Sequence, residues 1–170
     1  PALGELGIGH LSAVLLTHDH PDHRKGLLFV LQHFSVGEFW SAKKRSDLHP
    51  QLQQILNDRK IPLRQFSAGW TTVEKEAIRG LQLFHAPATN ENDSSIVLYL
   101  QQQGHGLLLS GDMEANGVHR LLAAGLPGPV DLLKIPHHGS RHSATDRLLR
   151  RLQPAISLVS AGYQNRYRFP

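Results

Sequence analysis

Short apolar runs alternate with helical patterns along the first half of the chain. Residues 11–17 form an apolar run that ends in a dense polar stretch, which predicts a buried strand followed by a loop. From residue 22 to residue 34 apolar side chains recur at helical spacing. The next segments are predicted as a strand at 38–40, a helix at 48–56 and extended chain at 61–66 and 81–84. A histidine-rich stretch therefore lies where a strand passes into a helix.

The second half of the chain repeats this alternation. Residues 95–101 and 107–110 are apolar segments around a glycine-containing turn, the pattern of a β-hairpin. The remaining elements are predicted as a helix at 115–124 that Gly125 ends, a buried strand at 130–135, a basic amphipathic helix at 144–152 and a last strand at 156–160. Strands interleaved with helices predict a layered α/β (α+β) fold, in which polar groups collect in the loops after strand ends.

Composition bounds the possible classes of protein. The 170 residues, 40% hydrophobic and 19% charged, fit a single folded domain over residues 1–170 and exclude a disordered chain. Without cysteine, any metal site must use imidazole and carboxylate ligands. No apolar run approaches the roughly 20 residues of a membrane-spanning helix, and the chain does not open with a signal-peptide pattern.

The balance of charge is basic. The formal net charge is +4 and the sequence pI is about 9.7, which favours a polyanionic partner such as nucleic acid or an acidic membrane surface. Basic residues gather at 24–25, 43–45, 147–151 and 166–168. Each cluster is equally well explained as solvated surface.

Histidines are over-represented, and four metal-ligating side chains fall within six residues. His18 and His20 leave the predicted strand on the same side, whereas Asp22 and His23 begin the predicted helix. Such a loop divides into two half-sites and suits a centre of two ions. The alternative is a histidine-rich surface turn that binds no metal.

Two further strand ends carry candidate ligands. Asp112 follows an apolar strand, where its two oxygens could bridge two ions, although taken alone this aspartate is better explained as the N-cap of the helix that follows. His137 and His138 follow the strand at 130–135, and the adjacent Gly139 lets the backbone approach a ligand closely. This pair suggests one metal ligand and one base that faces the substrate, with buried hydrogen-bonded imidazoles as the alternative.

These motifs carry a resemblance to a known family. Residues 17–23 resemble the signature turn of metallo-β-lactamase-fold hydrolases. Segments 92–98, 107–112, 133–140 and 160–167 resemble, in order and in register, the C-terminal domain of ComEC-type DNA-internalisation competence proteins. The similarity runs from about residue 11 to the end of the chain.

The resemblance implies a fold and a function. The expected fold is an αββα sandwich with a two-metal site at one edge, truncated at both ends of this chain. The expected activity is that of a binuclear metal-dependent hydrolase, a phosphodiesterase or nuclease that degrades the non-transported strand of DNA during natural transformation. The expected partners are single-stranded DNA and the membrane-channel portion of the same polypeptide, at the outer face of the inner membrane.

The same resemblance assigns roles to individual residues. The expected cofactors are two divalent ions, zinc or manganese, without a small organic cofactor. The first ion would be held by His18 and His20, with His85 as the candidate for a further ligand. The second would be held by Asp22, His23 and His138, and Asp112 would bridge both. Asp22 and His137 are assigned to catalysis, and Lys134, Ser140 and Asn165 to substrate binding.

The sequence also departs from the family pattern. Lys25-Gly26 stands where two glycines are usual, and Phe169-Pro170 stands where His-Pro is usual, which could remove a substrate contact. Two other functions also stay open. One is hydrolysis of a small phosphodiester, as in a phosphorylcholine-esterase-like enzyme; the other is a non-catalytic module that guides DNA into a membrane channel.

Overall fold

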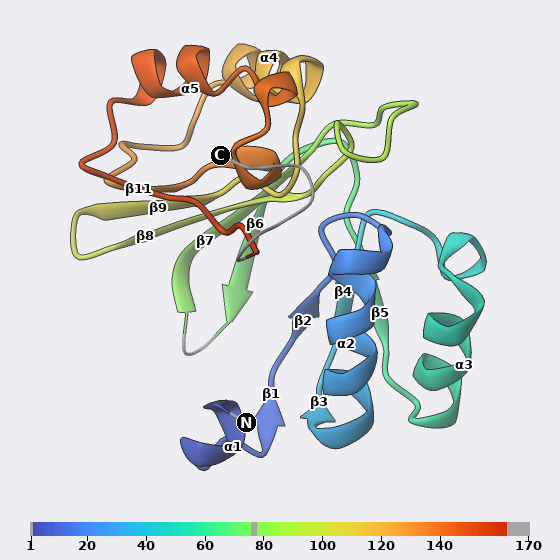
Figure 1. Cartoon of the computed structure of the whole chain (residues 1–170). Helices are drawn as coiled ribbons and strands as arrows, with labels where there is room; N and C mark the ends of the chain where they lie inside the picture. Colours follow the sequence, from blue (N-terminus) through green and yellow to red (C-terminus); the bar gives the residue numbers. More distant parts are fainter. Residues whose placement is uncertain (1, 76–77, 163–170) are drawn as a thin grey trace. The chain divides into compact units, whose positions relative to one another are not determined.

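Residues 2–75 and 78–162 are described by the computed structural model, in which the chain forms two compact units. Unit 1 is Pro1–Phe66 and unit 2 is Ser67–Pro170. Each unit has its own sheet, helices and hydrophobic core (Figure 1). The expectation of a single domain over residues 1–170 stays a prediction.

Unit 1 is built from parallel strands that helices connect. Its elements are α1 (Ala2–Glu5), β1 (His10–Leu11), β2 (Val14–Leu15), α2 (Pro21–His33), β3 (Ser35–Val36), β4 (Phe39–Ser41), the 3-10 helix η1 (Arg45–Asp47), α3 (Pro50–Asp58) and β5 (Leu63–Gln65). Strands β2, β4 and β5 form a parallel sheet in that order, and β1 pairs in parallel with β3. Because parallel strands need a crossover connection, α2 and α3 link successive strands of the sheet.

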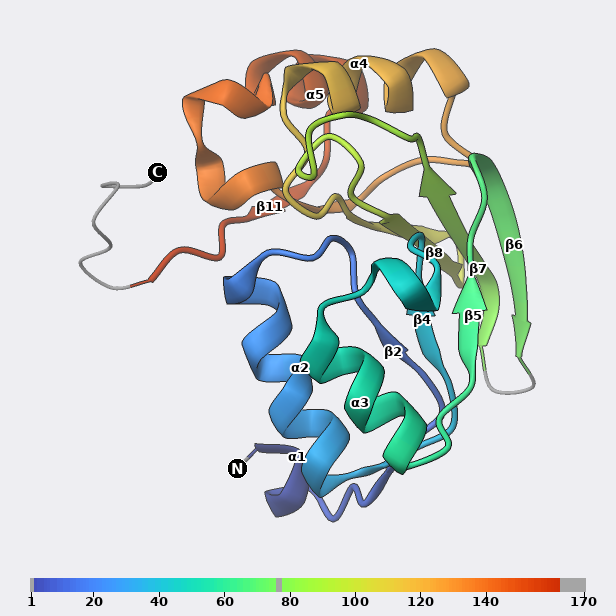
Figure 2. The same ribbon diagram turned by 90° about the vertical axis from the view of Figure 1, so that its right-hand side faces the viewer.

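The core of unit 1 lies between its sheet and the two longer helices. Leu16 and Phe39 from the sheet side pack with Leu31 of α2 and with Leu52 and Leu56 of α3, and all five are buried. The spacing of four residues in α3 places its apolar side chains on one face. Figure 2 shows α2 and α3 on the same side of the sheet. The histidine loop, defined here as residues 17–23, leaves this core at the end of β2.

Unit 2 contains a six-stranded sheet in the order β11-β10-β9-β8-β7-β6. Its elements are β6 (Gly69–Lys75), β7 (Ile78–His85), β8 (Val97–Gln102), β9 (His105–Leu109), α4 (Ala115–Ala124), β10 (Leu132–Lys134), the 3-10 helices η2 (Pro136–Gly139) and η3 (Arg141–Ser143), α5 (Thr145–Leu152) and β11 (Ile156–Leu158). Strands β6 to β9 are antiparallel, and β9, β10 and β11 are parallel. It follows that β7, β9, β10 and β11 all run in one direction, so their carboxyl ends share one edge of the sheet.

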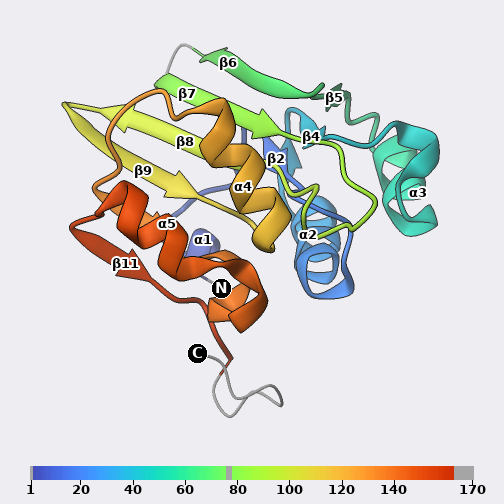
Figure 3. The same ribbon diagram turned by 90° about the horizontal axis from the view of Figure 1, so that it is seen from above.

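Two helices cover one face of this sheet. Figure 3 shows α4 and α5 lying side by side over it. The buried side chains come from both layers: Val97, Tyr99, Leu108 and Leu133 from the strands, and Val118, Leu121 and Leu148 from the helices. No helix within residues 2–75 and 78–162 is long and apolar enough to cross a membrane.

The predicted hairpin and helices are confirmed within a few residues. In the β8–β9 turn, Gln103 and Gly104 both have positive φ (51° and 85°), as a two-residue hairpin turn of the primed type requires. The predicted strand at 11–17 is instead two short strands, because β1 pairs with β3 whereas β2 pairs with β4. Strand β6 was not predicted, and its pairing with β7 is irregular between Val73 and Lys75.

Candidate metal centre

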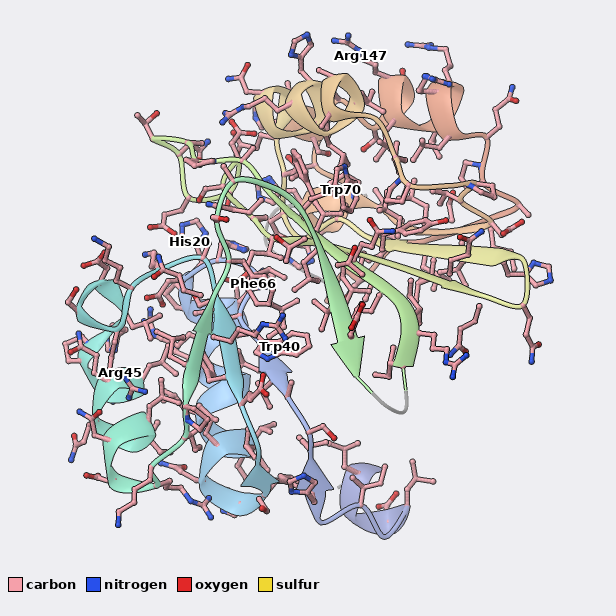
Figure 4. The ribbon with its side chains drawn as sticks, turned by 180° about the vertical axis from the view of Figure 1, so that it is seen from behind. His20, Trp40, Arg45, Phe66, Trp70 and Arg147 are labelled. Atoms are coloured by element: carbon pink, nitrogen blue, oxygen red, sulfur yellow. The ribbon has the colours of Figure 1, made fainter. Side chains whose placement is uncertain are left out.

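The histidine loop turns sharply from β2 into α2. His20 is the N-cap residue of α2, and its carbonyl oxygen accepts hydrogen bonds from the amides of His23 (3.1 Å) and Arg24 (2.9 Å). Pro21 occupies the first helical position, where the missing N–H costs no hydrogen bond and the fixed φ suits the helix. Local sequence therefore encodes the turn, at which Figure 4 labels His20.

The imidazole rings of the loop lie against one another. The centroid of the His18 ring is 4.7 Å from that of His20 and 4.2 Å from that of His23. The Asp22 carboxylate reaches within 3.7 Å of His23 Nε2 and is 64% exposed. The two half-sites expected from the sequence therefore adjoin, because the buried His18 ring contacts a ring from each of them.

Asp19 anchors this loop, although sequence reasoning passed over it. Its side chain is 5% exposed; Oδ1 accepts a hydrogen bond from Arg24 Nη1 at 2.7 Å, and Oδ2 accepts one from the His49 amide at 3.0 Å. Lys43 Nζ lies 3.9 Å from the same Oδ2. One carboxylate thus ties the loop to α2 and to the start of α3. Its position between two histidines was the signal available in the sequence.

In unit 2 the candidate ligands gather because four strands share a direction. His85 ends β7, Asp112 follows β9, and His138 follows β10. Ser160 follows β11, the edge strand. The carboxyl ends of these strands lie at one edge of the sheet, so residues distant in the sequence become neighbours.

Asp112 contacts a cation and an imidazole. It is 3% exposed, Oδ1 lies 3.3 Å from Lys134 Nζ, and Oδ2 lies 3.2 Å from His138 Nε2. The Asp112 amide donates to Ser95 Oγ at 3.2 Å. The carboxylate is therefore held on both sides at the strand end.

The alternative role of Asp112 as a helix cap is wrong. The N-cap residue of α4 is Glu114, and a different carboxylate meets the first amides of the helix. Asp93 Oδ1 accepts hydrogen bonds from the amides of Glu114 (3.0 Å) and Gly117 (2.7 Å). The buried Asp93 thus satisfies the first amides of α4. The Asp112 carboxylate instead faces Lys134 and His138.

His138 is oriented through its second ring nitrogen. Nδ1 lies 2.5 Å from the carbonyl oxygen of Ser160, to which it donates, so Nε2 is the nitrogen directed toward Asp112. A histidine that binds a metal almost always donates its other N–H in this way. His138 also has a left-handed backbone (φ 54°), which is uncommon outside glycine and clusters at functional sites.

His137 has a different carboxylate neighbour. Its Nδ1 lies 3.6 Å from Glu114 Oε1, and its backbone is also left-handed (φ 47°). The Glu114 carboxylate accepts hydrogen bonds from the side-chain amides of Asn90 (2.9 Å) and Asn92 (3.0 Å). Two consecutive residues with left-handed backbone thus direct neighbouring rings to separate acidic groups, and the different roles expected for the two histidines stay a prediction.

His85 lies at the same edge of the sheet, and a hydrogen bond fixes the tautomer of its ring. It is 8% exposed, and its Nδ1 donates to the carbonyl oxygen of Ser94 at 3.0 Å, so Nε2 carries the lone pair. Burial lowers the pKa of His85, which the Ser94 hydrogen bond opposes and the nearby charge of Arg120 reinforces. A neutral imidazole with a preset tautomer is the form that binds a metal.

The residues assigned to substrate binding are placed as follows. Lys134 Nζ donates to the carbonyl oxygen of Gly111 at 2.8 Å and faces Asp112, so its ammonium supports the carboxylate. The buried Ser140 hydroxyl accepts from the His142 amide at 3.3 Å and caps η3. Asn165 lies outside the described residues. All three assignments stay predictions. The contacts described for Lys134 and Ser140 are with other residues of this chain.

The donors in each unit fit a borderline divalent ion. Imidazole and carboxylate suit zinc and manganese, and no thiolate is present. His85 and His138 each have Nδ1 on a backbone carbonyl, which leaves Nε2 for coordination. The residues therefore fit a metal cofactor, which would polarise a bound phosphodiester or acidify a water molecule.

Comparisons with known proteins agree with this fold. Residues 1–163 match the family model described as the Metallo-beta-lactamase superfamily. The chain is 30% identical over 178 residues to ComE operon protein 3 of Bacillus subtilis (strain 168), covering 100% of this chain and 22% of that protein. It is 25% identical over 171 residues to Competence protein ComA of Neisseria gonorrhoeae, covering 100% of this chain and 23% of that protein. The chain thus spans about a fifth of the length of these relatives.

A solved structure has a similar fold. The chain superposes on CmlA, a diiron beta-hydroxylase from Streptomyces venezuelae, with a TM-score of 0.53 and 17% sequence identity, over 85% of this chain and 28% of that one. At this identity the likeness concerns the fold alone. Together the comparisons confirm the predicted metallo-β-lactamase fold and the predicted resemblance to competence proteins.

Proposed function

Because the chain belongs to the metallo-beta-lactamase superfamily, we propose that it is a metal-dependent phosphodiesterase that acts on DNA during DNA uptake. One observation carries the proposal: His138 Nε2 is held 3.2 Å from the buried Asp112 carboxylate, while Nδ1 is bonded to the Ser160 carbonyl. A buried carboxylate beside a ring of fixed tautomer is an arrangement suited to a divalent ion.

We propose that the histidine loop and the strand-end residues of unit 2 contribute ligands to one centre of two divalent ions, zinc or manganese. The ligands are His18, His20 and His85 for the first ion, Asp22, His23 and His138 for the second, and Asp112 as the bridge. The fixed Nε2 of His85 supports its inclusion, which completes the set for the first ion. Lys134 restrains the Asp112 carboxylate between its partners.

The side chains around this centre are proposed to move protons. The ions would supply an acidified water and would stabilise negative charge on the attacked phosphodiester. The exposed Asp22 carboxylate accepts the proton of the attacking water at Oδ2. His137 donates a proton to the leaving oxygen, with Glu114 stabilising the protonated ring from 3.6 Å.

DNA is proposed as the substrate because of the competence relatives and the positive charge. One relative bears the name Competence protein ComA, and this chain has a net charge of +4. The proposal includes single-stranded DNA as substrate, degradation of the non-transported strand, and attachment to the membrane-channel portion of a longer polypeptide at the outer face of the inner membrane.

The test is cleavage of labelled single-stranded DNA with added manganese or zinc, with and without chelator. The proposal predicts cleavage that the chelator stops and that Asp112→Ala abolishes, while Asp58→Ala, an exposed acidic control, retains it. Both variants should keep the circular dichroism spectrum of the parent.

Two other outcomes would overturn the proposal. Hydrolysis of bis(p-nitrophenyl) phosphate without cleavage of DNA would indicate a small phosphodiester as substrate. A folded protein that binds DNA but retains no metal after dialysis against zinc or manganese would indicate a module that guides DNA without cutting it.

A further inference from the structure

A basic groove lies between α4 and α5 in unit 2, apart from the candidate ligands. Its volume is about 420 Å³, and it is lined by His119, Leu122 and Ala123 of α4 and by Arg147, Arg150 and Arg151 of α5. The volume falls within the roughly 300–1,000 Å³ typical of ligand sites. From this groove we infer an accessory binding site for the phosphate backbone of single-stranded nucleic acid; this inference rests on the proposed function.

The arginines face outward because of the pattern of α5. Positions 147, 150 and 151 are three and four residues apart, so they share one face of the helix. Leu148, between them, is buried in the core, and Leu149 and Leu152 pack against the same core. Figure 4 labels Arg147, whose side chain points away from the sheet. The helix α5 therefore exposes its arginine side chains to solvent and packs its leucines against the core.

These guanidinium groups are available to an external anion. Within residues 2–75 and 78–162, no ion pair engages Arg147, Arg150 or Arg151. The only carboxylate on either helix is that of Asp146, in the first turn of α5. Arginine binds phosphate in a bidentate manner, and a row of three provides successive contacts along a backbone.

The groove favours nucleic acid over a membrane surface. None of the exposed large hydrophobic residues lies on α4 or α5, and the apolar lining of the groove consists of the partly buried Leu122 and the small Ala123, so these helices offer no large exposed apolar side chain for insertion into lipid. The helix α4 begins at Ala115, after Asp112, and α5 begins at Thr145, after His138 and η3; none of the candidate ligands lines the groove. The inferred site would hold a strand away from the residues that cut it.

The test measures binding of a fluorescein-labelled oligothymidylate of about twelve nucleotides, a length within the range of single-strand sites. Anisotropy is recorded in chelator, so that the probe stays intact, at several salt concentrations. The groove variant carries Arg147→Gln, Arg150→Gln and Arg151→Gln. The matched control carries Lys44→Gln, Lys60→Gln and Arg79→Gln, three exposed basic residues elsewhere whose loss changes the net charge equally.

The groove variant should bind the probe at least about ten-fold more weakly, and its log–log salt slope should fall by about two, since each phosphate contact on a single strand contributes about 0.7. The control should stay within about two-fold of the parent. Hydrolysis of bis(p-nitrophenyl) phosphate should be unchanged in both.

Other results would overturn the inference. Equal weakening in both variants would mean that net charge, not the groove, binds the strand. Unchanged binding in the groove variant would mean that its arginines are only solvated. Loss of binding to vesicles of phosphatidylglycerol and phosphatidylcholine, with oligonucleotide binding retained, would identify a membrane contact. Specific oligonucleotide binding without hydrolysis of any phosphodiester would refute the proposed function and leave the groove standing.

Discussion

The two units position their candidate ligands in different ways. In unit 1 all four come from the histidine loop, and the rings of His18, His20 and His23 lie against one another. In unit 2 they come from three distant strand ends, and both His85 and His138 donate Nδ1–H to a backbone carbonyl. Unit 1 is thus organised by a local turn that Asp19 anchors, whereas unit 2 is organised by sheet topology.

The two clusters should therefore respond differently to substitution. In unit 1 one buried carboxylate makes the contacts to both helices, because Asp19 joins the loop to Arg24 and to the His49 amide. The unit 2 cluster is held by several hydrogen bonds, since the Asp112 amide, the His85 ring and the His138 ring each bond a different residue. Changes in the two units should therefore separate loss of stability from loss of chemistry.

The largest separable effect is expected at His137. His137→Ala should lower turnover by about 10²–10⁴-fold, because it removes the proposed proton donor, and bound metal should be unchanged. Turnover is measured on a phosphodiester and metal by elemental analysis, with His105→Ala on the exposed β8–β9 hairpin as control. Metal loss equal to that of Asp112→Ala would show that His137 is a ligand.

Asp19→Ala should destabilise the protein by about 3–5 kcal/mol, because it leaves the largely buried Arg24 without its carboxylate. The free energy of unfolding is measured in urea. Asp58→Ala, at the exposed end of α3, should change it by less than about 0.5 kcal/mol. A loss of similar size in both variants would mean that Asp19 does not anchor the loop.

Asp93→Ala should cost about 1–2 kcal/mol, as expected for removal of a helix cap from α4. Asp93→Asn keeps an oxygen acceptor and should recover most of this loss in the same urea titration. Asp112→Ala is compared in metal-free protein. If Asp93→Ala lowered the free energy of unfolding no more than a control substitution does, Asp93 would not be the cap of α4.

The smallest effect concerns pH. Burial lowers the pKa of His85 in the folded state. At pH values below the unfolded pKa, the unfolded chain therefore binds a proton at His85 more readily than the folded protein does. In chelator, His85 should not affect the free energy of unfolding above its unfolded pKa of about 6.5. As pH falls below that value, His85 should lower the free energy of unfolding by at most about 1.4 kcal/mol per pH unit. His85→Gln should flatten the unfolding free energy against pH in this range; an unchanged curve would refute the role of burial.

Sequence predicted the contiguous parts of the molecule better than the distributed ones. The histidine loop, the β8–β9 hairpin and α4 follow from local spacing and turn residues, and the structure has them in place. The partners of Asp112 could not be predicted in this way, because strand order and direction decide that β10 lies beside β9. The contacts of Asp93 and Glu114 arise across loops, so no local pattern reveals them.

Whether both units contribute ligands to one metal centre is tested by measuring metal stoichiometry in a pair of variants, one from each unit. The protein, His20→Ala and Asp112→Ala are dialysed against zinc or manganese, and bound metal is measured by elemental analysis beside the circular dichroism spectrum of each. If both units serve one centre, the parent should hold two ions, and each folded variant should lose metal. Full metal content in His20→Ala, with loss confined to Asp112→Ala, would contradict a shared centre.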